Sequence, residues 1–210
     1  MKLFYWPVNP VRLNQGFGEN KGCIDNATNS KVISCDGLNP PTGYRSVYSQ
    51  MKGHNGLDLM AVRWQPVYAA REGVVREVET EPARGLGVGI DHDFGAQGRW
   101  KSRYWHLTAI DVHMGEKVST GQLVGYADNT GYSAGDHLHF EVKALNADGT
   151  NMYPDNGYYG GVDPWPLMFD DFARNINVLR MTIETLASMV EKLIDRMRAT
   201  KTGTVRRALP

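Results

Sequence analysis

Residues 137–143 read His-Leu-His-Phe-Glu-Val-Lys, and this short run decides how the middle of the chain should fold. Apolar residues occupy every second position, and successive side chains of a β-strand point to opposite faces of a sheet. The apolar members should therefore share the face that packs: Leu138, Phe140 and Val142. The polar members should share the face that looks into a cleft: His137, His139 and Glu141.

Further short β-rich segments, bounded by glycines, surround this run. They cover residues 66–70, 73–79, 87–92, 103–107 and 122–127. Short alternating segments separated by turn residues are typical of all-β proteins. We therefore predict a compact, mainly β domain over about residues 54–166.

The composition bounds the class of protein. The chain has 210 residues, of which 41% are hydrophobic, and its 23 basic and 23 acidic residues cancel. A neutral chain has no overall field that would attract a nucleic acid or an anionic membrane. No apolar run approaches the roughly 20 residues that a membrane-spanning helix needs. We expect no nucleic-acid partner and no membrane span.

The first 53 residues are rich in turn-forming residues and predict loop with little regular structure. They contain the two cysteines, Cys23 and Cys35, which are equally compatible with a disulfide and with two free thiols. The opening run, residues 1–7, has one lysine and reaches a proline before any apolar stretch of sufficient length. That pattern argues against a secretory signal peptide.

From residue 171 the hydrophobic period changes. Apolar residues recur at alternating steps of four and three, with no glycine or proline between them. They are Phe172, Ile176, Leu179, Ile183, Leu186, Val190, Leu193 and Met197. We predict a long amphipathic α-helix over 171–200, followed by a basic flexible tail over 201–210. The helix is expected to support self-association or docking, because its apolar seam needs a partner.

The histidines are the candidates for chemistry. His54 precedes Asp58 by four residues, and His137 and His139 stand two apart, a set of groups that can ligate zinc. On an extended strand the Cα atoms of His54 and Asp58 would lie roughly 13 Å apart, so the chain should bend, and Gly56 permits the bend.

Two other segments bear on the histidine assignment. In residues 103–107, alternation should place Tyr104 and His106 on one face, opposite Trp105 and Leu107, so that His106 lines the same cleft. The remaining histidines, His92 and His113, are expected to be surface or hydrogen-bonded residues rather than ligands.

The order of the motifs along the chain resembles the lysostaphin-type, or LytM-like, zinc metallopeptidases, which cleave the peptide part of bacterial peptidoglycan. The motifs that carry the resemblance are Gly16-Phe17-Gly18, His54-Asn55-Gly56-Leu57-Asp58-Leu59, Tyr104-Trp105-His106-Leu107, Thr130-Gly131-Tyr132-Ser133 and Gly135-Asp136-His137-Leu138-His139-Phe140-Glu141-Val142. The resemblance covers about residues 6–168 and implies an antiparallel β-sheet core.

The resemblance also implies the roles of the residues. His54, Asp58 and His139 would bind one zinc ion, and His106 and His137 would be the unligated catalytic histidines. Three protein ligands leave a fourth tetrahedral position for water, as a catalytic zinc site requires. The implied protein is a zinc endopeptidase of peptidoglycan, acting on the cell wall outside the cytoplasm. The alternative is a non-catalytic relative that binds wall or activates another hydrolase.

Some features depart from the family pattern. Residues 19–50 form a long insertion within a metallopeptidase domain of residues 1–170, Asp136 stands where proline is common, and Arg63-Trp64-Gln65 replaces a turn that usually contains glycine. With no signal peptide expected, a phage-type lysin or virion-associated wall hydrolase is favoured over a conventionally secreted enzyme.

Overall fold

The structure of the protein is a computed structural model that describes residues 1–19, 22–32, 35, 37–46 and 51–169. One ten-stranded antiparallel sheet dominates this part of the chain and confirms the predicted mainly β fold. Its strands are β1 (Leu13–Gln15), β5 (Leu57–Met60), β6 (Pro66–Tyr68), β7 (Gly73–Glu81), β8 (Gly85–Asp93), β9 (Arg99–Ile110), β10 (Lys117–Val118), β11 (Leu123–Ala127), β12 (His137–Leu145) and β13 (Gly161–Val162).

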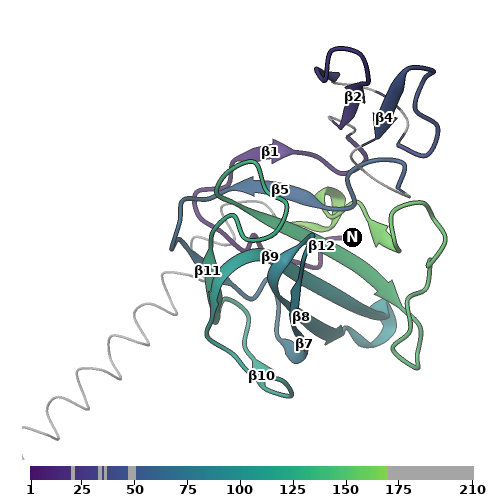
Figure 1. The fold of residues 1–210 in the computed structure, drawn as a ribbon. Coiled ribbons are helices and arrows are strands. Elements are labelled where there is room, and N and C mark those ends of the chain that lie inside the picture. Colours follow the sequence, from purple (N-terminus) through teal and green to yellow (C-terminus); the bar gives the residue numbers. More distant parts are fainter. Residues whose placement is uncertain (20–21, 33–34, 36, 47–50, 170–210) are drawn as a thin grey trace, which may run out of the picture. The chain divides into compact units, whose positions relative to one another are not determined.

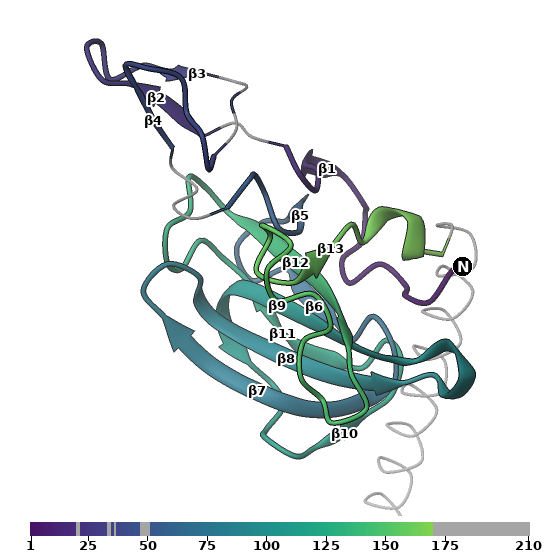
Figure 2. The ribbon, with the colours of Figure 1, turned by 90° about the vertical axis from the view of Figure 1, so that its right-hand side faces the viewer.

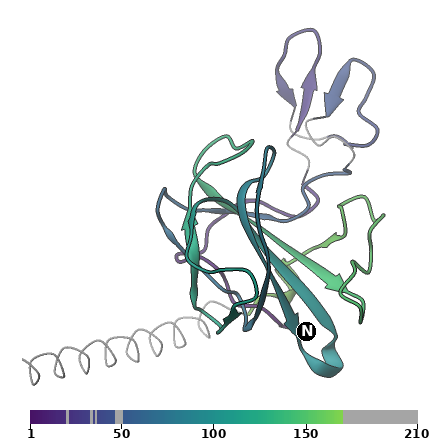
Figure 3. The same cartoon turned by 60° about the horizontal axis from the view of Figure 1, so that its bottom comes forward.

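The order of the strands places β12 at the centre of the site-bearing region. Across the sheet the strands run β1-β5-β12-β9-β8-β7-β10 (Figure 1). Off this path, β11 pairs with β6 and β9, and β13 pairs with β12. The long strands β7, β8 and β9 lie side by side (Figure 2 and Figure 3). The described ranges also contain two 3-10 turns, η1 (Gly95–Gln97) and η2 (Trp165–Leu167).

The register between the strands brings the predicted motifs together. His139 on β12 pairs with Asp58 on β5 and, on the other side, with Trp105 on β9. Cross-strand neighbours on one face have Cβ atoms about 4.5–5.5 Å apart. The first and last metal motifs, 81 residues apart in sequence, are therefore adjacent in the sheet.

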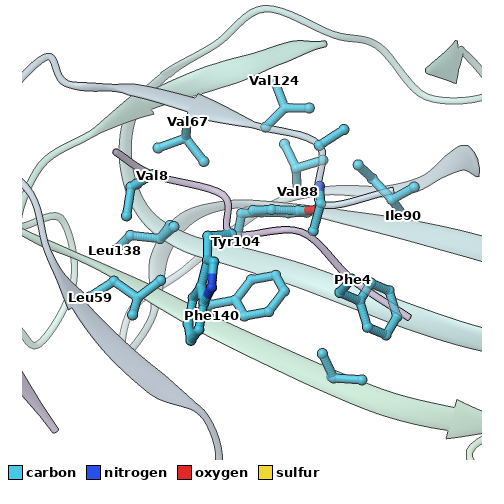
Figure 4. Close-up of a cluster of buried hydrophobic side chains, with 14 of the residues drawn as sticks. Phe4, Val8, Leu59, Val67, Val88, Ile90, Tyr104, Val124, Leu138 and Phe140 are labelled. Atoms are coloured by element: carbon cyan, nitrogen blue, oxygen red, sulfur yellow. The ribbon is translucent and has the colours of Figure 1, made fainter. Parts of the chain in front are cut away.

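The apolar face of β12 packs as its alternation predicts. Leu138, Phe140 and Val142 are fully buried in the main hydrophobic cluster. Figure 4 shows the first two beside buried side chains of neighbouring strands and of the N-terminal segment: Val8, Leu59, Val67 and Tyr104. Because this packing fixes the orientation of the strand, the alternate histidines must emerge on the opposite face.

The N-terminal region is more ordered than the sequence predicts. Residues 3–8 contribute four buried apolar side chains to the core, and the main-chain N–H of Tyr68 donates to the carbonyl of Pro7 at 2.9 Å. Three of the strands form a separate small sheet in the order β3-β2-β4: β2 (Cys23–Asp25), β3 (Lys31–Val32) and β4 (Tyr44–Ser46). The prediction of loop over this insertion is therefore wrong in part.

The two cysteines of the insertion are joined in a disulfide, with their Cα atoms 6.0 Å apart. Next to Cys23, the turn that leaves β2 is closed by the Asp25 carboxylate, which accepts hydrogen bonds from the main-chain N–H groups of Ala27 and Thr28. Local side-chain hydrogen bonds of this kind stabilise the turn, and the strands beside it show no alternating apolar pattern. The pattern of the sequence therefore did not predict these short strands.

The predicted C-terminal helix over 171–200 and the basic tail over 201–210 lie outside the described residues. Within the described ranges, no helix combines the length and the apolar character that a membrane crossing requires.

Candidate metal centre

Three side chains from two strands and their lead-in loop converge on one point. Nε2 of His54 lies 3.0 Å from Oδ1 of Asp58 and 2.8 Å from Nδ1 of His139. Nδ1 of His139 lies 2.9 Å from the same Asp58 oxygen. All three residues are largely buried, and their three atoms could hold one metal ion. Two imidazoles and a carboxylate are a donor set that suits zinc, which binds nitrogen and oxygen at about 2.0–2.2 Å.

His54 and His139 each have an outer ring nitrogen, the one that points away from Asp58, and each of these nitrogens is held by another group. Nδ1 of His54 lies 3.0 Å from the carbonyl oxygen of Gly16, and Nε2 of His139 lies 3.2 Å from Oε1 of Glu141. If each outer nitrogen carries the proton and donates it, each inner nitrogen is left with a lone pair facing Asp58. Outer hydrogen bonds of this kind orient metal-ligating histidines and fix their tautomers. The residues present therefore fit a bound zinc ion.

Gly56 provides room for this arrangement. A Cβ atom at this position would lie 2.5 Å from the carbonyl oxygen of Phe140 and 3.0 Å from a ring carbon of His139. The bend predicted between His54 and Asp58 is present, since β5 begins only at Leu57. The space that a side chain would need at Gly56 is occupied by the main chain of β12 and the ring of His139.

Glu141 is a fully buried carboxylate directly behind the metal centre. It accepts a hydrogen bond of 2.8 Å from the side-chain amide of Asn55, in addition to its contact with His139. Three cationic side chains lie 3.6–3.8 Å from its oxygens: Arg84, Arg103 and Lys143. A buried charge is tolerated only when it is paired in this way.

The protonation of the centre follows from this network. Burial alone would raise the pKa of Asp58, but the hydrogen bonds of the three surrounding imidazoles outweigh it and hold the pKa well below its usual range. Burial would lower the pKa of His139, yet the carboxylates of Asp58 and Glu141 raise it to about 9. Without a metal, a positive charge therefore sits between two carboxylates, at the place where a cation would bind.

His106 reaches the centre by a route that alternation did not predict. One residue of β8, Gly87, faces two residues of β9, Trp105 and His106, because Leu86 pairs with Leu107 and Val88 pairs with Tyr104. The additional residue on β9 makes this irregularity a β-bulge, and within it His106 adopts a left-handed backbone conformation with φ of 64°.

The bulge corrects the predicted faces of β9. Tyr104 points into the core, where its hydroxyl accepts a hydrogen bond of 2.8 Å from the main-chain N–H of Ala70. Trp105 lies opposite His139 on the metal-centre face, beneath the guanidinium groups of Arg84 and Arg103. The prediction that Tyr104 shares the face of His106, opposite Trp105, is therefore wrong.

The ring of His106 nevertheless lies at the centre, as predicted. Its centroid is 4.7 Å from that of His137 and 6.0 Å from that of His139. Its Nδ1 lies 2.6 Å from the carbonyl oxygen of Thr130. Burial, followed by the positive charge of His139, lowers the pKa of His106 to about 4.

His137 is placed beside the three converging residues. Its Nδ1 lies 2.8 Å from the carbonyl oxygen of Gly135, and its Nε2 lies 3.4 Å from Oδ1 of Asp58, farther than the nitrogens of His54 and His139. Burial lowers the pKa of His137, but the Asp58 carboxylate outweighs it, so that the pKa is raised overall. The structure thus brings all five predicted site residues together.

His92 and His113 lie outside this centre, as expected. His92 is buried against Phe4 and Phe94, with its ring nitrogens 2.7 Å from the carbonyl oxygen of Glu72 and 2.8 Å from the hydroxyl of Ser102. Burial lowers its pKa to about 4, so the ring is neutral near pH 7. The exposed His113 lies 2.8 Å from Glu116.

Glu141 is the residue whose importance the sequence did not reveal. Alternation places it on the histidine face, two residues after His139, but nothing in the pattern says that its carboxylate contacts the outer nitrogen of that ring. Of the cations around it, only Lys143 lies on the same strand; Arg103 comes from β9 and Arg84 from the β7–β8 turn, and no local sequence motif indicates that these two lie nearby.

Removing the charge of Glu141 should weaken metal binding. Glu141→Gln keeps an oxygen that can accept the His139 proton but leaves the surrounding cations less compensated. We expect zinc affinity to fall by about 10–100-fold, the usual effect of losing such a partner. Competition with a chromophoric chelator measures it, with melting temperature as a check on folding. Glu79→Gln, which alters a 43% exposed carboxylate near Arg103, is the control. Parental affinity in folded Glu141→Gln would contradict the expectation.

Fold and site together define the class. A mainly β domain that brings two imidazoles and a carboxylate to one point, with two more imidazoles beside them, has the active-site layout of a metallopeptidase. Residues 52–154 match peptidase family M23, and the range includes all five site residues. The chain contains a domain of this family.

Characterised relatives share part of this domain. The chain is 37% identical over 116 residues to the peptidoglycan DD-endopeptidase ShyA of Vibrio cholerae, covering 53% of this chain and 26% of ShyA. It is 31% identical over 116 residues to the glycyl-glycine endopeptidase ALE-1 of Staphylococcus capitis, covering 55% of this chain and 29% of ALE-1. The match thus spans only about a quarter of the length of these relatives.

Solved structures agree with the fold. A zinc-containing peptidase from Vibrio cholerae is similar with a TM-score of 0.53 at 28% identity, covering 77% of this chain and 39% of that one. The catalytic domain of lysostaphin from Staphylococcus simulans has a TM-score of 0.52 at 23% identity, with coverage of 75% and 92%. At the latter identity the likeness concerns the fold alone.

Proposed function

We propose that this protein is a zinc-dependent endopeptidase that hydrolyses peptide bonds of bacterial peptidoglycan. One observation carries the proposal: three potential ligand atoms within 3.0 Å of one another, flanked by the two further rings of His106 and His137. The M23 domain and its named peptidoglycan endopeptidase relatives support the substrate class. The place of action would then be the cell wall, outside the cytoplasm.

In this proposal His54, Asp58 and His139 hold the metal. A bound zinc ion supplies Lewis acidity, which polarises the scissile carbonyl and makes a water molecule more acidic. The fixed outer nitrogens of the two histidines keep their inner nitrogens pointed at the ion, so that binding requires little rearrangement of the side chains.

The two flanking histidines handle the protons and the developing charge. Each has its Nδ1 beside a main-chain carbonyl, that of Thr130 for His106 and that of Gly135 for His137. This leaves each Nε2 as the nitrogen that can meet the substrate. One ring can accept a proton from water and return it to the leaving amine, while the other donates a hydrogen bond to the forming oxyanion.

Digestion of purified peptidoglycans tests the proposal. Intact sacculi of several chemotypes are incubated with the zinc-loaded protein, and mass spectrometry identifies the released fragments. We expect new amino termini at one kind of peptide bond and none in a parallel incubation with His139→Ala. No release from any chemotype would instead favour the alternative, a non-catalytic relative that binds wall or activates another hydrolase.

Two finer expectations from the sequence have no support in the described residues. A phage or virion origin stays a prediction, and so does self-association through the 171–200 segment.

A further inference from the structure

An exposed apolar side chain stands directly beside the catalytic histidines. Met60, the last residue of β5, pairs with His137 across the sheet and lies two residues after Asp58, so it shares the metal-centre face. Its neighbours on the other face, Leu57 and Leu59, are buried, whereas Met60 is 50% exposed. A methionine therefore flanks the mouth of the centre on the side of His137.

The turn that follows β5 extends this apolar surface. Val62 is 69% exposed and Trp64 is 56% exposed. The main-chain N–H of Trp64 donates to the carbonyl of Ala127 at 2.9 Å, and that of Arg63 donates to the Asp136 carboxylate at 3.2 Å. These bonds tie the turn to the segments next to the catalytic residues.

Asp128 links the same turn to both histidines. Its main-chain N–H donates to the carbonyl of His106 at 2.9 Å, and its carbonyl accepts from the N–H of His137 at 3.1 Å. Its buried carboxylate lies 3.4 Å from the guanidinium of Arg63. Arg63, the residue before Trp64, is thus connected through Asp128 to the strands that carry His106 and His137.

Trp64 is held in a conformation that does not suit its side chain. Its φ is 65°, in the left-handed region that favours glycine and is an outlier for a bulky residue. The side chain is more than half exposed, and its one ring contact among the described residues is with Tyr126, at 5.6 Å between centroids. Packing does not explain why a tryptophan occupies this position, and strained residues that packing does not explain point to function.

A second exposed aromatic residue lies in the loop whose neighbouring residues contact His106 and His137. Tyr132 is 86% exposed. It lies between Thr130, whose carbonyl contacts Nδ1 of His106, and Ser133, whose hydroxyl lies 3.2 Å from Nδ1 of His137. The loop that positions both catalytic rings therefore also presents a tyrosine to solvent.

We propose that these four residues, the apolar rim of Met60, Val62, Trp64 and Tyr132, bind the aliphatic side chains of the substrate residues that flank the cleaved bond. An alanine methyl or the methylenes of a diamino acid would leave water on contact with the rim, and this burial favours binding. A glycine bridge has no side chain to offer. The protein should therefore prefer peptidoglycan stem peptides, or cross-links made directly between them, over oligoglycine bridges.

This inference rests on the proposed function and is tested with two soluble substrates. One is a cross-linked muropeptide dimer with a D-alanyl–diaminopimelate bond, and the other is pentaglycine. We expect kcat/KM to be at least about tenfold higher for the dimer, as one or more buried methyl or methylene groups would give. Equal or faster cleavage of pentaglycine would overturn the inference and leave the proposed function standing. Cleavage of neither substrate, with no release from any wall, would overturn the proposed function itself.

Trp64→Gly separates a substrate contact from a structural role. Glycine relieves the left-handed strain, so the melting temperature should stay the same or rise by about 2–4 °C. We expect kcat/KM for the dimer to fall about tenfold, mainly through KM, so that the preference for the dimer over pentaglycine shrinks. Parental kcat/KM for the dimer in this variant would overturn the assignment of Trp64.

Met60→Ser supplies a second test with a matched control. We expect it to lower kcat/KM for the dimer about tenfold, because it removes apolar contact beside His137. Met114→Ser changes a methionine of similar exposure, 57% against 50%, in the connection between β9 and β10, and should leave both substrates unaffected. Equal effects of the two substitutions would count against the rim.

Discussion

His139→Ala should lose both zinc and hydrolysis, whereas His137→Ala should keep near-stoichiometric zinc and lose about 10²–10⁴ in rate, the usual contribution of a general acid or base. The two residues share one face of β12 and stand two positions apart, so spacing alone does not separate them. The structure places Nδ1 of His139 at 2.9 Å from the Asp58 oxygen and Nε2 of His137 at 3.4 Å.

The hydrogen-bond partners of the ring nitrogens that point away from Asp58 also favour His139 as the metal ligand. His139 is fixed by the Glu141 carboxylate, as a ligand histidine would be, while His137 is held by the Gly135 carbonyl near the end of its strand. A fourth protein ligand would also take the position that water needs.

Elemental analysis and kinetics on both folded variants decide the matter. If His137→Ala is the variant that loses the metal, the two roles are reversed. If both variants keep metal and rate, the reactive centre lies elsewhere. His113→Ala serves as the control, because that ring is exposed and contacts Glu116 rather than the centre.

Removal of the metal should abolish hydrolysis, and added zinc should restore it. The ligands must be deprotonated to bind, so a chelator or mild acid should strip the ion. In the metal-free protein His139 has a pKa of about 9, which means that it is protonated at pH 7 and that zinc must displace this proton. Binding should therefore release protons and weaken as the pH falls.

Isothermal calorimetry in buffers of different ionisation enthalpy measures that release directly, independently of catalysis. The fold should survive metal removal, because the core beneath β12 does not include the ligands. Full activity in a preparation shown by elemental analysis to be metal-free would contradict the assignment.

The sequence predicted β12 and its two faces because one physical pattern governs the whole strand. Leu138 and Phe140 must be buried together, and burial of one face forces His137 and His139 to the other. The pairing of Asp58 with His139 is the register that places these two proposed metal ligands next to each other.

The same reasoning failed on β9, because a single additional residue changes the alternation. The run from Tyr104 to Leu107 contains no glycine or proline that would signal a bulge, and the glycine that accommodates the Trp105 ring is Gly87 on the neighbouring strand. Long-range packing of this kind has no local signature in one segment. The small disulfide-linked sheet escaped prediction for a related reason, since strands of two or three residues are too short to show a period.

The bulge in β9 also sets a condition for transplanting this centre into another protein. With regular alternation, a strand that buries Tyr104 would also direct residue 106 inward, so a histidine grafted at that position would point into the hydrophobic interior. The extra residue lets Tyr104 and Leu107 both be buried while the imidazole between them turns outward. A designed scaffold that copied only the histidines and the aspartate, without the bulge, would reproduce the proposed metal ligands but would turn the His106 ring away from them. The irregular backbone is thus part of the proposed active site and has to be built into the scaffold deliberately.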